Sequence, residues 1–213
     1  LFYSCQVVGK GMGGATAAVR RVAFVDVSAQ MGGVEFSTLY LAERLRRDQF
    51  EPLVVCPAEG DLARECRVRA IPVAILPRPR LFSTSFTAGR RAVPNPLAWA
   101  ANAGLFIVIA ARLAKSLRRQ GVALVCTKGL FAHFYGGLAA RWAGLPCVWH
   151  AQDLLSARAG GMYPFVFGVA ARLLAGRVIA DGAPIADQLA PHYPADRIAI
   201  IHNGVDTDLF SPT

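Results

Sequence analysis

Short apolar runs alternate along this chain with longer segments in which apolar residues recur at the spacing of one helix face. The first run, Arg21–Val27, is rich in β-branched residues and is typical of a strand. Between Val34 and Leu45 apolar residues recur every three or four positions, which predicts a helix. Continued along the chain, the pattern predicts strands at 52–56, 72–76, 122–127, 145–150, 177–180 and 197–201, and helices at 61–69, 97–119, 131–143, 163–175 and 184–189.

The predicted strands lack the polar alternation of a half-exposed sheet and therefore read as buried on both faces. This pattern predicts a single α/β domain, a doubly wound, Rossmann-like parallel sheet with helices on both faces. We expect the domain to span residues 21–202, after a glycine-rich flexible leader over residues 1–20. Prolines and small polar residues predict a loop over 78–96. In such folds ligands bind at the carboxyl ends of the strands.

The composition fits one globular domain, with 54% apolar and 17% charged residues in a chain of 213. These values exclude a disordered tail and a disulfide-stapled miniprotein. The five cysteines show no C-x-x-C spacing, so neither a zinc site nor a disulfide framework is predicted, and we expect a reducing, cytoplasmic compartment. No D-x-D pair directly follows a predicted strand, so we expect chemistry without a metal or a bound cofactor.

The charge is unevenly distributed. Lysine and arginine total 23 against 14 acidic residues, yet Cys66 to Gln152 contains twelve basic residues and no acid. Such a block attracts anions: phosphates, an anionic membrane surface or nucleic acid. A solvated basic face without a partner is the alternative. Nucleic acid is disfavoured because aromatic residues are not interleaved with the basic ones and no reading module is recognisable.

The predicted helix at 97–119 raises the question of a membrane, because no charged residue occurs from Ala92 to Ala111. Proline, asparagine and glycine interrupt this stretch, and its uninterrupted apolar run falls short of the roughly 18 residues that a span requires. Packing on the sheet is therefore favoured over an interfacial helix on an anionic bilayer, and a true span is the least favoured interpretation. The arginine-containing loop before it, with Arg90 and Arg91, is where we expect a phosphate-bearing or lipid-linked acceptor to dock.

Several motifs, in order, resemble one enzyme family. The stretch Asn203–Asp206, followed by Phe210 and Pro212, resembles the N-G-V-D-x-x-x-F-x-P interdomain segment of retaining GT-B glycosyltransferases of the family 4 type. Gly32–Glu35 is similar to the G-G-x-E opening of that family's first helix, and Leu145–His150 to its strand ending in histidine. The resemblance extends over nearly all of residues 21–213. Where the family's next strand usually runs into a serine, this chain has Asp181-Gly182.

The resemblance implies a hexosyltransferase-type enzyme that moves a sugar from a UDP- or GDP-linked nucleotide sugar to an acceptor, with retention at the anomeric carbon. It also implies that these residues form the acceptor-side domain, with 203–213 as the interdomain hinge. The nucleotide would then be held mainly by a C-terminal donor domain missing from these 213 residues, without which we expect no activity. Localisation is expected to be cytoplasmic, with peripheral attachment to the inner face of the membrane.

Carried over residue by residue, the resemblance implies a catalytic role for His150, at the end of a central strand. It implies that Gly32 and Gly33 contact the donor diphosphate. The residues expected to contact the acceptor are Lys128, Asp153, Arg90 and Arg91. The family usually has an acid directly after the histidine, whereas here Asp153 is the first one.

Alternatives stay open for each feature. His150 could be packed under a loop, Lys128 could be solvated, and His133, inside a predicted helix, is expected to be packed. The chain could also be a non-catalytic, membrane-associated subunit that recruits a separate donor-domain chain. A dinucleotide-binding Rossmann domain is disfavoured because the first loop offers only Gly32-Gly33 and the second strand has no clear ribose-binding acid.

Overall fold

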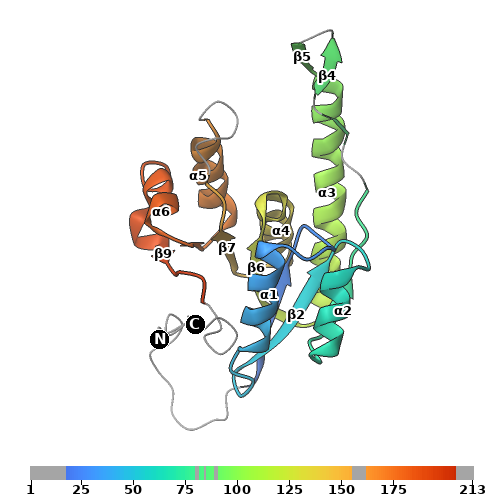
Figure 1. Cartoon of the computed structure of the whole chain (residues 1–213), viewed down its shortest axis with the longest axis vertical. Coiled ribbons are helices and arrows are strands. Elements are labelled where there is room, and N and C mark those ends of the chain that lie inside the picture. Colours follow the sequence, from blue (N-terminus) through green and yellow to red (C-terminus); the bar gives the residue numbers. More distant parts are fainter. Residues whose placement is uncertain (1–17, 80–81, 84, 89–90, 155–161, 205–213) are drawn as a thin grey trace, which may run out of the picture.

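In the computed structural model, the described residues are 18–79, 82–83, 85–88, 91–154 and 162–204. They form a parallel seven-stranded sheet in the order β3-β2-β1-β6-β7-β8-β9 (Figure 1). The strands are β1 (Arg20–Val25), β2 (Phe50–Cys56), β3 (Val73–Ile75), β6 (Val122–Lys128), β7 (Cys147–Ala151), β8 (Arg177–Ala180) and β9 (Ile198–Ile200).

Helices cover both faces of this sheet, as the sequence predicts. They are α1 (Gly33–Glu43), α2 (Asp61–Val68), α3 (Pro96–Arg119), α4 (Leu130–Ala143), α5 (Tyr163–Leu174) and α6 (Ala183–Leu189), with a 3-10 turn, η2, at Ala195–Arg197. Helices α1 and α2 pack on one face through a core that includes Leu39 and Leu62. Helices α3 to α6 pack on the other through Leu113, Trp149 and Phe167. The predicted doubly wound fold is confirmed.

The predicted loop over 78–96 is partly wrong. It contains a two-stranded antiparallel hairpin, β4 (Ser85–Ala88) with β5 (Arg91–Pro94), and α3 begins at Pro96. The Asn95 side chain caps that helix by accepting a hydrogen bond from the Ala98 N–H at 3.1 Å. The hairpin strands contain Ser85, Thr87, Arg91 and Pro94 and so lack the continuous apolar run from which the other strands are predicted.

Helix α4 packs closely on the sheet and on α5 because glycines line its inner side. A Cβ on Gly136 would approach the Thr127 Cγ2 to 2.6 Å, and one on Gly137 would approach the Leu174 Cβ to 2.9 Å. His133, on the same helix, is buried, stacks on Trp149 and shares a 2.8 Å hydrogen bond with the Thr127 hydroxyl. Burial lowers its pKa to about 3, so His133 is the packed residue that was predicted.

Helix α3 packs along only part of its length. Ile109, Leu113 and Leu117 are buried in the core, whereas Leu97, Ile107 and Val108 are exposed, and the helix rises past the sheet toward the hairpin (Figure 1). By length and composition α3 could cross a membrane, and 35% of its most apolar stretch is buried. Core packing, the favoured interpretation, therefore accounts for the buried side of α3 but not for its exposed apolar residues.

Candidate functional site

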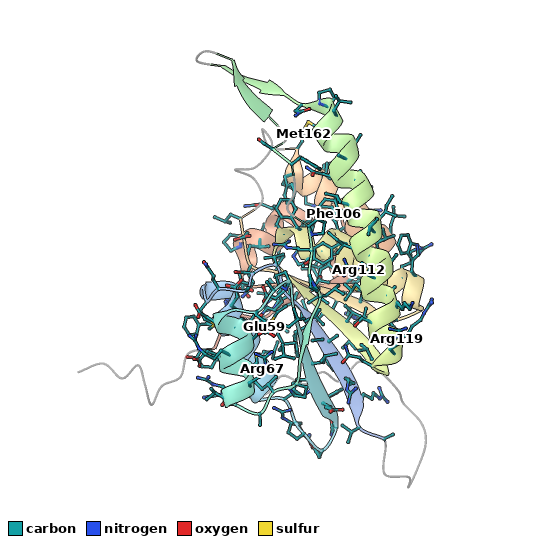
Figure 2. All side chains as sticks on the ribbon, turned by 90° about the vertical axis from the view of Figure 1, so that its right-hand side faces the viewer. Glu59, Arg67, Phe106, Arg112, Arg119 and Met162 are labelled. Atoms are coloured by element: carbon teal, nitrogen blue, oxygen red, sulfur yellow. The ribbon has the colours of Figure 1, made fainter. Side chains whose placement is uncertain are left out.

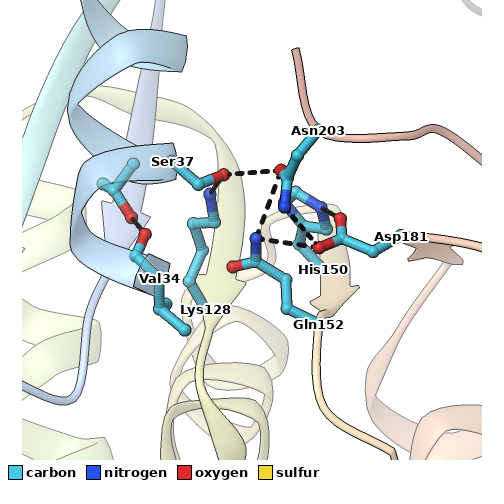
Figure 3. A network of polar contacts seen from close by, with 8 residues as sticks. Val34, Ser37, Lys128, His150, Gln152, Asp181 and Asn203 are labelled. Carbon is cyan, nitrogen blue, oxygen red and sulfur yellow. Dashed lines mark hydrogen bonds and ion pairs between the residues drawn. The ribbon is translucent and has the colours of Figure 1, made fainter. Parts of the chain in front are cut away.

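Polar side chains from strands far apart in the sequence meet at the carboxyl edge of the sheet (Figure 3). β7 contributes His150 and, just beyond its end, Gln152; β6 contributes Lys128; and Asp181 follows β8 directly. Asn203, after β9, closes the group. Parallel strands all end at the same edge, so their order, β6-β7-β8-β9, sets which side chains become neighbours.

His150 is paired with an acid. Its Nε2 lies 2.8 Å from the Asp181 Oδ1, and the two side chains are 8% and 16% exposed. Because a carboxylate only accepts hydrogen bonds, Nε2 carries the hydrogen and Nδ1 is left as an acceptor. Burial lowers the pKa of His150 below its ordinary value, and Lys128 adds to this, although Asp181 opposes both. The imidazole is therefore neutral near pH 7.

Asp181 also holds two amide side chains. Its Oδ2 accepts hydrogen bonds from the Asn203 Nδ2 at 2.6 Å and from the Gln152 Nε2 at 3.2 Å. Burial alone would raise the pKa of Asp181, but the bonds from His150 and Gln152 and the charge of Lys128 outweigh it, and the pKa lies below its ordinary value. Asp181 is thus the negative centre of the site.

A second branch of the network connects this centre to α1. The Ser37 hydroxyl donates to the Asn203 Oδ1 at 3.0 Å and accepts a hydrogen bond from the Lys128 Nζ at 2.8 Å. Lys128 is fully buried, so the solvated alternative for this residue is wrong. Burial lowers its pKa, while nearby Asp26 and Asp181 oppose that effect. The Lys128 ammonium therefore lies inside the network and is held by Ser37.

Asp26 shapes the loop after β1. Its Oδ1 accepts the Val27 and Ser28 N–H groups at 2.7 and 3.3 Å, and its Oδ2 accepts the Thr38 hydroxyl at 2.8 Å. These bonds turn the chain, which explains why β1 ends at Val25 and not at the predicted Val27. Burial, opposed by Thr38 and reinforced by the charge of Glu35, raises the pKa of Asp26 to about 6.

The two predicted glycines lie where α1 begins. Gly32 is its N-cap, and a Cβ there would lie 2.8 Å from the Glu35 Oε2. A Cβ on Gly33 would meet nothing within 4 Å, so this backbone borders open space into which a ligand can fit. Their contact with a donor diphosphate stays a prediction.

A small hollow of about 260 Å³, including its open side, lies beside the network. It is bounded by Val34 of α1, by the start of α4 and by the residues after β7, including Gln152 and Asp153. Its lining is Val34, Gly129, Leu130, His133, Ala151, Gln152, Asp153 and Phe167. Asp153, a predicted acceptor contact, therefore lies within reach of the network.

The other two predicted acceptor contacts are Arg90 and Arg91. Arg90 lies outside the described residues, and for Arg91 only the backbone, in β5, is described. Among the described ranges, no group of three or more His, Cys, Asp or Glu residues is placed to hold a metal ion.

Sequence reasoning assigned no role to Ser37, Gln152 or Asp181, and none beyond the hinge to Asn203. The replacement of the family's usual serine by Asp181 was the available signal, but its meaning depends on β8 lying next to β7.

The fold defines the class, a Rossmann-like domain of the kind that forms one half of the GT-B fold. The sequence model described as Glycosyltransferase Family 4 matches residues 31–209. The chain belongs to glycosyltransferase family 4, and the predicted family and fold are confirmed. No curated protein sequence matches the chain significantly.

Solved structures support the fold. HepE from Anabaena, in complex with UDP-glucose, superposes with a TM-score of 0.67 and 22% identity over 89% of this chain and 45% of its own. MurG from Acinetobacter baumannii superposes with a TM-score of 0.54 and 17% identity over 84% of this chain and 44% of its own. A UDP-N-acetylglucosamine 2-epimerase superposes with a TM-score of 0.56 and 14% identity over 87% of this chain and 48% of its own. The chain thus spans about half the length of these proteins. Likeness at such identities shows the fold alone.

Proposed function

We propose that this chain is the acceptor-side domain of a glycosyltransferase that moves a sugar from a nucleotide sugar to an acceptor, with retention at the anomeric carbon. In that reaction the bond between the anomeric carbon and the diphosphate breaks, the acceptor oxygen takes its place, and the acceptor's proton is released. A second α/β domain holds most of the nucleotide, and the cleft between the two domains encloses the reaction.

The observation that carries this proposal is a pair of buried acceptors without partners. Among the described residues, His150 Nδ1 and Gln152 Oε1 are buried and form no hydrogen bond. Buried polar atoms are normally paired, because an unpaired one costs about 1–3 kcal/mol. Two hydroxyl donors would satisfy them, and a sugar is a ligand dense in hydroxyl groups.

His150 then has a defined role. Its Nδ1 accepts a hydrogen bond from a sugar hydroxyl, while Asp181 fixes the ring at Nε2. The carboxylate behind the ring also favours positive charge on the sugar as the bond to the diphosphate breaks. Lys128, with its buried ammonium, is suited to the phosphate-bearing side of the same cleft.

The nucleotide is proposed to be uridine- or guanosine-linked. HepE was crystallised with UDP-glucose, which favours UDP for this chain. The epimerase neighbour shows that this fold also serves other sugar-nucleotide chemistry. Membership of glycosyltransferase family 4 favours transfer over epimerisation.

The test is sugar transfer by the full-length protein with a panel of UDP- and GDP-sugars. We expect His150→Ala to lower kcat/KM by about 100-fold, equivalent to about 2.7 kcal/mol of transition-state stabilisation. The matched control is His192→Ala, which removes an imidazole that lies just after α6 and packs edge-to-face with Phe165. Activity of His150→Ala within a few-fold of wild type would refute the role of His150, and no transfer from any donor would refute the proposed function.

A further inference from the structure

The chain leaves the sheet beside the polar network. β9 ends at Ile200, and the Ile201 N–H then donates to the Ala180 carbonyl at 2.9 Å. Residues 202–204 are exposed. Among the described residues, the hydrogen bonds that hold this stretch to the rest of the domain all come from the side chain of Asn203. The direction of the chain at this point therefore depends on one amide.

That amide contacts three elements of the domain. Its Oδ1 accepts hydrogen bonds from the Ser37 hydroxyl of α1 at 3.0 Å and from the Gln152 Nε2, after β7, at 3.3 Å. Its Nδ2 donates to the Asp181 Oδ2, after β8, at 2.6 Å. Helix α1 follows β1, and two strands, β6 and β7, lie between β1 and β8 in the sheet. Asn203 therefore connects the two sides of the carboxyl edge (Figure 3).

The direction of each hydrogen bond in this row is fixed by the groups at its two ends. The Lys128 ammonium can only donate, so the Ser37 hydroxyl accepts from it and gives its own hydrogen to Asn203. The Asp181 carboxylate can only accept, so the Nδ2 of Asn203 faces it, and not the Oδ1. A row that runs from a buried cation to an anion is polarised along its length. It therefore holds the Asn203 amide in one orientation.

We propose that Asn203 is a positioning residue, which fixes the direction in which the chain leaves this domain and thereby places the donor domain over His150. Because it requires a second domain after the interdomain segment 203–213, this inference rests on the proposed function. Asn203 acts through that segment and not on the reacting atoms. A rotation of about 5° at the segment moves a group about 16 Å away, the radius of gyration of a domain of this size, by about 1.4 Å. A misplacement of about 1 Å can lower a rate about 100-fold.

The test uses the full-length protein with Asn203→Ala and Asn203→Asp. We expect kcat for sugar transfer to fall about tenfold in Asn203→Ala. It should fall at least as far in Asn203→Asp, because the new carboxylate keeps the shape of the amide but repels Asp181 and has no hydrogen to give it. The Kd for the nucleoside diphosphate of the accepted donor should stay within twofold, because the second domain holds most of the nucleotide. Small-angle X-ray scattering should show changed distances between the two domains.

The contact with α1 is tested by a double-mutant cycle. Ser37→Ala removes the bond to Asn203 and also the bond from the Lys128 ammonium. The second loss is the same whether or not Asn203 is present, so it cancels in the cycle. We expect Ser37→Ala to lower kcat at least threefold more in the wild-type background than in the Asn203→Ala background. Equal effects in both backgrounds would refute the coupling of α1 to the interdomain segment.

The matched control is Gln120→Ala, which removes a half-buried amide that donates to the Ser116 hydroxyl at 3.2 Å. Gln120 follows Arg119, at the end of α3 that lies farthest from the hairpin (Figure 2), and it precedes β6 at the amino edge of the sheet. The proposal is wrong if Gln120→Ala lowers kcat as much as Asn203→Ala does, or if the Kd rises as much as kcat falls. Near-UV circular dichroism checks folding, and Asn203→Asp tests the proposal even if Asn203→Ala unfolds.

Failure of this inference is distinguishable from failure of the proposed function. A wild-type protein that transfers sugar from no donor refutes the proposed function. A wild-type protein that transfers sugar, with both Asn203 variants within twofold of it, refutes the role of Asn203 alone. The scattering comparison needs no activity, so unchanged distances between the domains in both variants also overturn the inference.

Discussion

Removing the Asp181 side chain tests how the site is built. Asp181→Ala deletes the acceptor of three side chains: His150, Gln152 and Asn203. The hydrogen bond to His150 is between a buried ring and a charged group, a class worth about 1.5–3 kcal/mol, and the two amide bonds are longer or more exposed. Relief of the buried carboxylate offsets part of this loss. We expect the free energy of unfolding to fall by about 2 kcal/mol and Tm to fall by about 6 °C.

The same change should also act on the titration of His150. The hydrogen bond and the charge of Asp181 are the influences that raise the pKa of this histidine, whereas burial and Lys128 lower it. Without Asp181 the pKa of His150 should therefore fall further below its ordinary value. The ring also loses the bond that fixes its tautomer, so kcat should fall more than KM rises.

The assay is a pH titration of the histidine Cε1–H signals by NMR, combined with thermal unfolding and sugar transfer. Asp187→Ala is the matched control, because it removes an exposed acid from α6. If the pKa of His150 stays the same or rises in Asp181→Ala, Asp181 does not hold the ring as described. If Asp187→Ala changes the pKa of His150, the stability and the sugar transfer as much as Asp181→Ala does, these effects come from the net charge and not from the His150–Asp181 pair.

Three further predictions concern the buried groups. Asp26→Asn should flatten the pH dependence of unfolding. The pKa of about 6 exceeds the ordinary 3.8, so Asp26 adds about 2 kcal/mol of stability as pH falls from 6 to 4, and denaturant titrations across that range would show its loss. Gly137→Val should destabilise the fold by about 1–3 kcal/mol in thermal unfolding, because its Cβ would lie 2.9 Å from the Leu174 Cβ. The control is Gly104→Ala, which should be neutral or stabilising because a Cβ there meets nothing within 4 Å. Lys128→Met should raise the pKa of His150 in the NMR titration, because the lysine charge lowers it; an unchanged value would contradict the proximity of the two groups.

The site shows where local sequence reasoning ends. Lys128 follows apolar residues at a strand end, and nothing in its neighbourhood along the chain distinguishes a solvated lysine from a buried one. In the fold Lys128 is buried and its ammonium donates to Ser37 of α1, which lies 91 positions away. The hydrogen bond between Asp181 and His150 joins residues 31 positions apart in the sequence, and that between Ser37 and Asn203 joins residues 166 positions apart.

The alternation of β-branched runs with segments of helical spacing by itself determined the α/β class. It also determined where along the chain each strand of the seven-stranded sheet occurs, because period and propensity act over a few neighbouring residues. The absence of acids from Cys66 to Gln152 likewise needs no structure to be seen. The strand order, the short β4–β5 hairpin and the pairing of His150 with Asp181 were decided only by the tertiary structure. They depend on which strand ends meet across the sheet, and that choice is made by burial of the whole core and not by any segment alone.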